Sequence, residues 1–228
     1  MFEKFFIQPI YNILVLIAAN LSQPNLGVSV IVLVIFLRLL LWPFFHKAIV
    51  SQAVIKKIQP EVERIRKVYK NDQVAQTKEL LALYKKNNFN PFSSFLGLLI
   101  QLPVLIALYQ VFLRTTNGVE LSLLYPGVPR LGELQTLFLG AFELTQANLI
   151  FSLIAALLQG GYSFLLSKTQ KQGLTEITML LLSPLITFAV VSRLPSVIAL
   201  YWSVTTIISI FQQLITERLI KKANERVS

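Results

Sequence analysis

A single arginine interrupts a long apolar stretch and is the residue of this sequence that points most clearly to chemistry. Residues 28–45 read VSVIVLVIFLRLLLWPFF, with Arg38 near the middle. A helix of about 20 apolar residues spans a bilayer, and a rise of about 1.5 Å per residue puts Arg38 about 12 Å from the nearer end of the stretch. Snorkelling over that distance is unfavourable, and a charge inside hydrocarbon is costly. Arg38 is therefore expected to face a hydrated cavity or a binding partner.

Two interpretations of Arg38 stay open. The interiors of the other apolar segments supply no Asp or Glu to neutralise it. One hypothesis is that Arg38 lines a polar groove inside the membrane, where it attracts a negative group of another molecule. The other is that Arg38 is structural and is capped by carbonyl groups and glutamines.

Residues for other kinds of chemistry are scarce. The chain has no cysteine and one histidine, His46, which stands at the end of the apolar stretch beside Lys47. We therefore expect no metal site, no cofactor and no thiol chemistry. His46 has no obvious serine or carboxylate partner, which argues against a protease or another enzyme. No stretch resembles a nucleotide-binding loop, so no ATP-driven step is expected.

Composition defines the class of protein. Of 228 residues, 54% are hydrophobic and only 14% are charged. This balance is typical of a polytopic membrane protein and excludes a soluble domain.

The positive charge is unevenly distributed along the chain. The net charge is +10, and ten basic residues lie between Lys47 and Asn90. Further basic residues lie in a short loop and at the C-terminal end: Lys168, Lys171, Arg218, Lys221, Lys222 and Arg226. The positive-inside rule places these regions in the cytoplasm, with the N-terminus outside. Anionic lipid or ribosomal RNA are candidate secondary targets of this charge, whereas DNA is not expected.

The segments between these regions predict an all-α polytopic membrane protein with five transmembrane helices. Residues 47–91 have apolar residues every three or four positions with charges between them, which indicates a cytoplasmic helical hairpin held by an apolar seam. The N-terminal segment is interpreted as an outer interfacial helix, with a cleaved signal or an extra span as alternatives. The predicted segments are an interfacial helix at 1–25, spans at 26–46, 92–114, 147–167, 176–192 and 197–216, the hairpin at 47–91, outer connections at 115–146 and 193–196, a cytoplasmic loop at 168–175 and a basic tail at 217–228.

Several of these segments together resemble the YidC-type membrane protein insertases and their mitochondrial Oxa and chloroplast Alb relatives. Arg38 is followed five residues later by Pro43, and the hairpin contains IQPEVERIRKVYKND at residues 58–72. The remaining matching residues are Glu79, Leu83, Tyr84 and Lys85 in the hairpin, Asn90, Pro91, Leu99, Ile100, Gln101, Pro103, Ala107, Leu108 and Tyr109 in the second span, and Pro195, Leu200, Tyr201, Trp202, Gln212 and Gln213 in the last. The chain departs from the family's pattern at Ser93, Ser94, Gly97, Ser196, Val197 and Thr206.

The resemblance implies an insertase located in the bacterial inner membrane. Five spans would surround a hydrophilic groove that is open to the cytoplasm and to lipid. A short polar segment of a nascent membrane protein would enter this groove while its apolar helix moves into the bilayer, without ATP. The implied partners are nascent membrane proteins and the lipid bilayer, with the Sec translocon and the ribosome as further candidates.

The resemblance also assigns site residues. The implied groove residues are Arg38, Gln101, Gln159, Tyr201, Trp202 and Thr206. The implied recruitment residues of the hairpin are Lys56, Lys57, Glu61, Tyr69, Lys70 and Asp72. Simpler roles stay open for both sets, because polar side chains in spans often hold helices together and charged hairpin residues are often merely solvated. A small ion channel or secondary transporter that uses Arg38 is the alternative function, although no paired structural repeat is visible.

Overall fold

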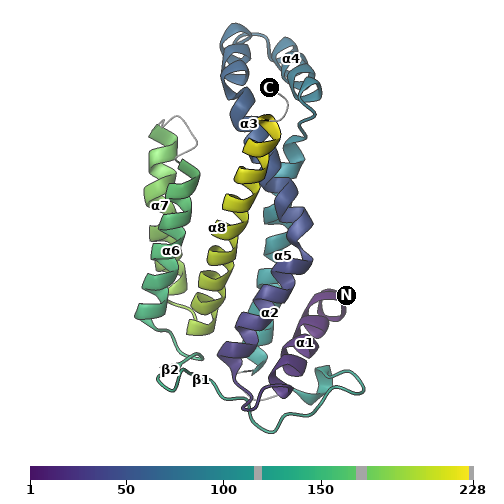
Figure 1. The fold of residues 1–228 in the computed structure, drawn as a ribbon, viewed down its shortest axis with the longest axis vertical. Helices are drawn as coiled ribbons and strands as arrows, with labels where there is room; N and C mark the ends of the chain where they lie inside the picture. The colour runs from purple at the N-terminus through teal and green to yellow at the C-terminus, as the bar shows by residue number, and fades with distance from the viewer. Residues whose placement is uncertain (116–119, 168–173, 226–228) are drawn as a thin grey trace. The chain divides into compact units, whose positions relative to one another are not determined.

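The chain is mostly helical, as the sequence predicts. The structure is a computed structural model that describes residues 1–115, 120–167 and 174–225 (Figure 1). A two-stranded hairpin of β1 and β2 was not predicted. Lys168, Lys171 and Arg226 lie outside the described residues. The elements are a short π-helix η1 (Glu3–Ile7), α1 (Gln8–Ala19), α2 (Leu26–Leu40), α3 (Trp42–Val68), α4 (Gln73–Lys86), α5 (Pro91–Thr115), a 3-10 turn η2 (Leu121–Leu123), β1 (Leu137–Phe138), β2 (Phe142–Glu143), α6 (Leu149–Ser167), α7 (Leu174–Val191) and α8 (Ser196–Glu225).

Length and apolar composition identify the helices that can cross a bilayer. Within the described ranges, Leu149–Ser167 and Ser196–Lys222 are long and apolar enough on their own. A third candidate span is formed if α2 and α3 are counted together as one broken span. Leu99–Arg114 and Leu180–Val191 are apolar but shorter. The structure therefore has two to three candidate spans by these criteria.

A break at Leu41 divides the apolar stretch that carries Arg38. Helix α2 ends at Leu40, and α3 begins at Trp42 with Pro43 in its first turn. Proline has no N–H group, and its ring clashes with the carbonyl four residues earlier, so a helix usually ends at or before the residue that precedes a proline. In the first turn of a new helix proline is tolerated. The predicted boundary at 46 therefore falls inside α3, which continues without interruption into the hairpin.

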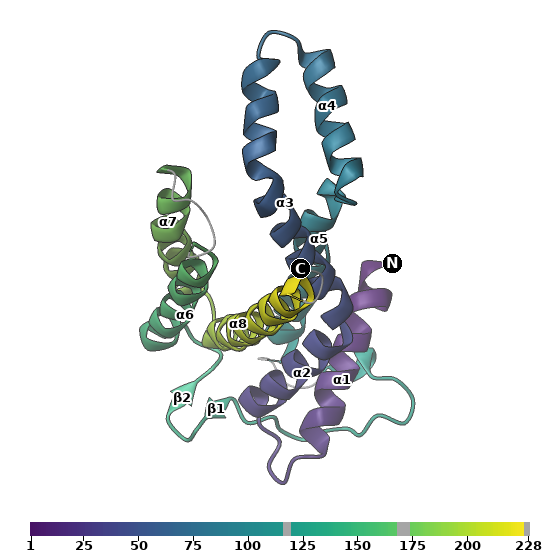
Figure 2. The ribbon, with the colours of Figure 1, turned by 45° about the horizontal axis from the view of Figure 1, so that its top comes forward.

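The described chain forms two compact units. The first contains Met1–Leu40 and Leu102–Phe211, and the second contains Leu41–Gln101 and Gln212–Ser228. In the first unit, α1 packs against α2, and α6 packs along α7 (Figures 1 and 2). Residues from α1, α2, α5 and α8 share one apolar core, whose largest fully buried side chains include Tyr11, Leu14, Leu33 and Phe112.

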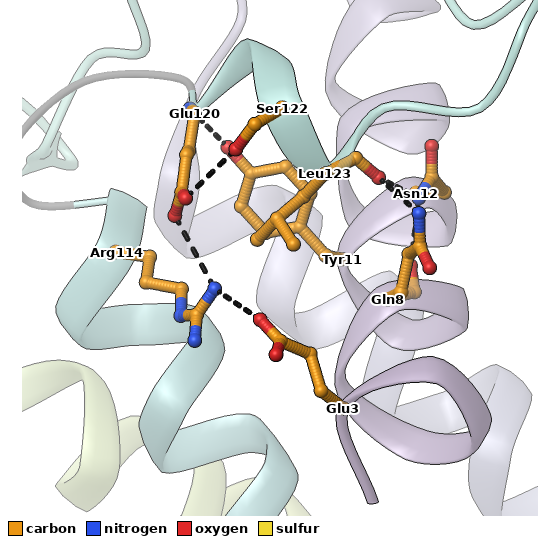
Figure 3. Close-up of polar contacts among 8 residues, drawn as sticks. All are labelled: Glu3, Gln8, Tyr11, Asn12, Arg114, Glu120, Ser122 and Leu123. Atoms are coloured by element: carbon orange, nitrogen blue, oxygen red, sulfur yellow. Dashed lines mark hydrogen bonds and ion pairs between the residues drawn. The ribbon is translucent and has the colours of Figure 1, made fainter. Parts of the chain in front are cut away.

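Polar contacts fix α1 to the connection that follows α5 (Figure 3). The side chain of Asn12 is buried; its Nδ2 donates to the Leu123 carbonyl at 2.8 Å, and its Oδ1 accepts from the Tyr125 N–H at 2.7 Å. The Glu120 N–H donates to the Tyr11 hydroxyl at 2.6 Å. Arg114 adds an ion pair of 2.9 Å to Glu3 and a longer one of 3.4 Å to Glu120. Helix α1 is thus an integral part of the first unit.

The β1–β2 hairpin is attached to the start of α2. A parallel bridge joins Asn25 to Gln135, and the Asn25 Nδ2 group donates to the Leu137 carbonyl at 3.0 Å. The ring of Phe138 covers Gly27 so closely that no Cβ atom would fit there. Gly27 is therefore required by a close approach between the hairpin and α2.

In the second unit, α3 and α4 form the predicted hairpin. Ile58, Val62 and Ile65 of α3 are buried with Leu83 of α4, and Phe89 completes the cluster. The predicted apolar seam is therefore confirmed. The Asp72 carboxylate accepts from the Ala75 N–H at 2.9 Å and caps α4, since the first N–H groups of a helix have no partner within it.

Candidate functional site

Arg38 lies in the last turn of α2 and is buried, with 8% of its surface exposed. Among the described residues, the titratable groups close enough to interact with Arg38 are two tyrosines from other helices of the first unit, Tyr201 of α8 and Tyr162 of α6. Tyr201 is itself buried, at 4% exposed. The apolar face of α2 therefore ends in a polar cluster to which three helices contribute. Tyrosine hydroxyls can accept hydrogen bonds from a guanidinium group while carrying no net charge.

A second polar contact joins two residues that lie close in the sequence to Tyr162 and Tyr201. The indole Nε1 of Trp202 donates to the Oε1 of Gln159 at 3.4 Å, which joins α8 to α6. Gln159 stands three residues before Tyr162, so the two side chains share a face of α6. The hydroxyl group of Ser163 on α6 lies 2.6 Å from that of Ser183 on α7 and connects these two helices.

Helix α8 carries further buried hydroxyl groups beyond this contact. Thr206 is 4% exposed and follows Trp202 by four residues, on the same face of the helix. Thr205, one turn after Tyr201, has a buried Oγ1 for which the described part of the chain supplies no hydrogen-bond partner. A buried hydroxyl group without a partner costs free energy unless another molecule satisfies it. Thr205 was not among the predicted site residues.

Five of the six predicted groove residues thus belong to the first unit, and four of them take part in the contacts around α2, α6 and α8. These four are Arg38, Gln159, Tyr201 and Trp202. Gln101 is half-buried on α5 and belongs to the second unit. Tyr162 was not among the predicted site residues, because its place near Arg38 depends on how α6 packs.

The predicted recruitment residues differ in their exposure. Lys56 is half-buried, and its ammonium group interacts with Glu217 of α8. Burial lowers the pKa of Lys56, and Glu217 partly opposes that shift. Glu61 and Tyr69 line a cavity of about 280 Å³ between α3 and α4. The remaining members are exposed: Lys57, Lys70 and Asp72.

The described residues contain no group of three His, Asp or Glu side chains placed to hold a metal ion. Gln159, Trp202 and the two tyrosines supply an amide, an indole and hydroxyl groups, which hydrogen-bond without a net charge.

Comparison with known proteins gives the family. The sequence model described as "60Kd inner membrane protein" matches residues 17–224. A protein of Clostridium tetani named "Membrane protein insertase YidC" is 33% identical over 211 residues, which cover 90% of this chain and 89% of that protein. The chain belongs to the YidC family of membrane protein insertases. The resemblance to the YidC-type insertases that the sequence motifs indicated is confirmed. Members of this family are inner membrane proteins, which places the chain in an inner membrane.

Longer YidC proteins match over only part of their length. The YidC of Rickettsia bellii is 29% identical over 207 residues, which cover 86% of this chain and 36% of that protein. A crystal structure described as an active YidC insertase with its first transmembrane domain resolved superposes with a TM-score of 0.63 at 25% identity, covering 95% of this chain and 46% of the other. The chain therefore spans less than half the length of these two relatives. The names of the YidC relatives describe insertases rather than enzymes.

Proposed function

We propose that this chain moves short polar segments of nascent membrane proteins through a hydrated groove within the membrane and releases their helices into the bilayer, without ATP. The observation that carries this proposal is the buried Arg38, which lies with two tyrosines inside an apolar helical unit. A polar segment that crosses hydrocarbon loses several kcal/mol for each unsatisfied polar group. Side chains such as Gln159, Trp202 and Thr206 would lower that cost by lining the groove.

Arg38 would attract acidic residues in the incoming segment. Two opposite charges 4 Å apart attract by about 4 kcal/mol at an effective dielectric constant near 20, before desolvation is subtracted. Tyr162 and Tyr201 contribute no net charge that would compete with such a residue. Transfer to the outer side can then draw on the membrane potential, worth about 2.3 kcal/mol per charge at 100 mV.

We further infer five spans, with the N-terminus outside and the C-terminus in the cytoplasm. The five are α6, α8, the broken helix of α2 and the start of α3, and the shorter apolar helices within α5 and α7. The basic residues of the α3–α4 hairpin and of the end of α8 would then lie on the cytoplasmic side, as the positive-inside rule requires. From there the hairpin would recruit nascent chains, the ribosome or the Sec translocon.

The test is insertion into liposomes that contain only this protein. A single-span test protein with a short acidic N-terminal tail is added, and protease protection of the tail is measured. We expect protection above that of empty liposomes, a loss of about tenfold in rate for Arg38→Ala, equivalent to about 1.4 kcal/mol, and near-full activity for Arg38→Lys. Arg193→Ala is the matched control, because Arg193 is exposed in the turn before α8 and lies outside the cluster.

The charge of the tail gives a second comparison. If Arg38 acts by attraction, a tail in which the acidic residues are replaced by Asn and Gln should be insensitive to Arg38→Ala. Equal loss with both tails would make Arg38 a structural residue. No protection with folded protein would refute autonomous insertion, and saturable ion flux through the same liposomes would favour a channel instead.

A further inference from the structure

A cavity of about 900 Å³ lies between the connection from α1 to α2 and the β1–β2 hairpin, at the opposite end of α2 from Arg38. Its lining combines polar and apolar residues: Leu21, Ser22, Gln23, Asn25, Val28, Gln135, Thr136, Leu137, Phe138, Leu139 and Gly140. None of these lining residues carries a charge. The cavity is thus large enough for part of a small amphipathic molecule and offers neutral hydrogen-bonding groups beside apolar ones.

An exposed apolar stripe of α2 begins inside this cavity. Val28 lines the cavity, and exposed apolar residues follow it at helical spacing: Val32, Ile35, Phe36 and Leu39. The opposite face of α2, with Val30, Leu33 and Val34, is buried in the core of the first unit. A stripe of this kind on a membrane helix faces acyl chains. The cavity is therefore continuous with a lipid-facing surface.

The hairpin presents a leucine to the same cavity in an unfavourable conformation. Leu139 has a φ angle of +53°, a region that a residue with a Cβ atom rarely adopts. Its side chain is 77% exposed, so packing within the described chain does not compensate the backbone strain. The neighbouring Leu137 is also exposed. Contact with acyl chains would bury both leucines and compensate that strain.

We propose that this cavity binds a glycerophospholipid of the outer leaflet. The ester and glycerol region would hydrogen-bond to uncharged groups such as Ser22 and Gln23, and an acyl chain would lie along the stripe that begins at Val28. Because no charged side chain lines the cavity, binding depends little on the headgroup. This inference rests on the membrane embedding of α2 in the proposed function, but it does not depend on the activity of Arg38.

The experiment uses the full chain in liposomes of phosphatidylethanolamine and phosphatidylglycerol with a trace of photoreactive phosphatidylethanolamine. The reactive diazirine is placed near the ester group, and crosslinked peptides are mapped by mass spectrometry. We expect crosslinks concentrated on residues 21–28 and 135–140. Val28→Trp, which places a bulky side chain where the stripe enters the cavity, should lower them about tenfold, equivalent to about 1.4 kcal/mol, and Gln23→Ala should lower them less.

Ile150→Trp is the matched control. Ile150 is an exposed apolar residue at the start of α6, so this substitution adds the same bulk to another lipid-facing helix end. The proposal is overturned if the crosslinks spread evenly over all exposed apolar faces, or if Val28→Trp and Ile150→Trp have equal effects. Displacement of the lipid crosslinks by the acidic-tailed test protein would assign the cavity to a peptide and also overturn it. If Arg38→Ala loses insertion but keeps its crosslinks, the lipid site is supported independently of the insertase function. If insertion is normal but no crosslinks concentrate in the cavity, the lipid site is overturned and the insertase function is not.

Discussion

Replacing Gly27 with alanine should destabilise the protein, because the added methyl group would clash with the ring of Phe138. A Cβ atom there would overlap Cδ2 of Phe138 and lie 2.8 Å from its Cγ. Phe138 has little room to move, since it is buried and makes an edge-to-face contact with Phe151 at 6.3 Å between ring centroids. Overpacking of this kind costs about 1–3 kcal/mol, and the gain from replacing a helical glycine is about 0.5–1 kcal/mol. Gly27→Ala is therefore expected to lower the free energy of unfolding by about 1–2 kcal/mol.

A double-mutant cycle isolates the contact with the ring. Phe138→Ala alone should cost about 3–5 kcal/mol, because a large buried side chain is lost. In that background the ring no longer obstructs Gly27, so Gly27→Ala should become neutral or stabilising by up to about 1 kcal/mol. Unfolding by titration with a denaturing detergent, followed by circular dichroism, measures all four proteins.

Gly161 provides the control for this cycle. An added Cβ atom on Gly161 in α6 would meet no atom within 4 Å, so Gly161→Ala should not destabilise either background. If Gly27→Ala were equally harmful with and without the Phe138 ring, the clash would not be the cause and the reasoning would fail.

Three further predictions concern polar groups. Asn12→Ala leaves the Tyr125 N–H without its partner and removes one of two donors to the Leu123 carbonyl, the other being Gln8, so it should lower the free energy of unfolding by about 1–3 kcal/mol. The same titration measures this, and an unchanged midpoint would contradict it. Burial alone would raise the pKa of Glu143, but hydrogen bonds from surrounding hydroxyl and backbone groups outweigh it and hold the pKa below its ordinary value. The ionised Glu143 side chain therefore stabilises the folded protein fully above its unfolded-state pKa of about 4.3, and this stabilisation is lost as the pH falls through the lowered pKa of the folded state. In Glu143→Gln the melting temperature should therefore fall less steeply at acid pH. Glu217→Gln should lower the pKa of Lys56 further and speed its acylation at mildly alkaline pH, with exposed Lys57 as the internal control; equal labelling in both proteins would show that Glu217 does not act on Lys56.

The sequence predicted those features whose signals are local. The period of apolar residues located the α3–α4 hairpin and its seam. Motifs spread over most of the chain identified the family. The break at Leu41 also has a local signal, because Pro43 cannot continue a helix that begins upstream, but the long apolar run 28–45 predicts one unbroken span.

Features that join distant parts of the chain could not be predicted. Tyr162 and Tyr201 come from separate helices, and their effect on Arg38 depends on packing that no sequence period encodes. The contacts of Asn12 join a helix to the connection between α5 and β1, and no sequence period links residues that are 111 positions apart. The cavity beside β1 likewise depends on a two-stranded hairpin too short to give an alternating pattern.

The same contact of Asn12 has a consequence for how the protein is made. Its partner Leu123 is synthesised 111 residues later, and at about 5–20 residues per second this takes about 6–22 s. During that time the amide of Asn12 and the hydroxyl of Tyr11 lack the partners that the connection after α5 supplies, although both side chains are buried in the finished protein. Helix α1 can therefore reach its final place only after α5 has been synthesised and its connection has followed. The N-terminal helix of this insertase family member must therefore wait for a segment synthesised at least 109 residues later before it can complete its own native contacts.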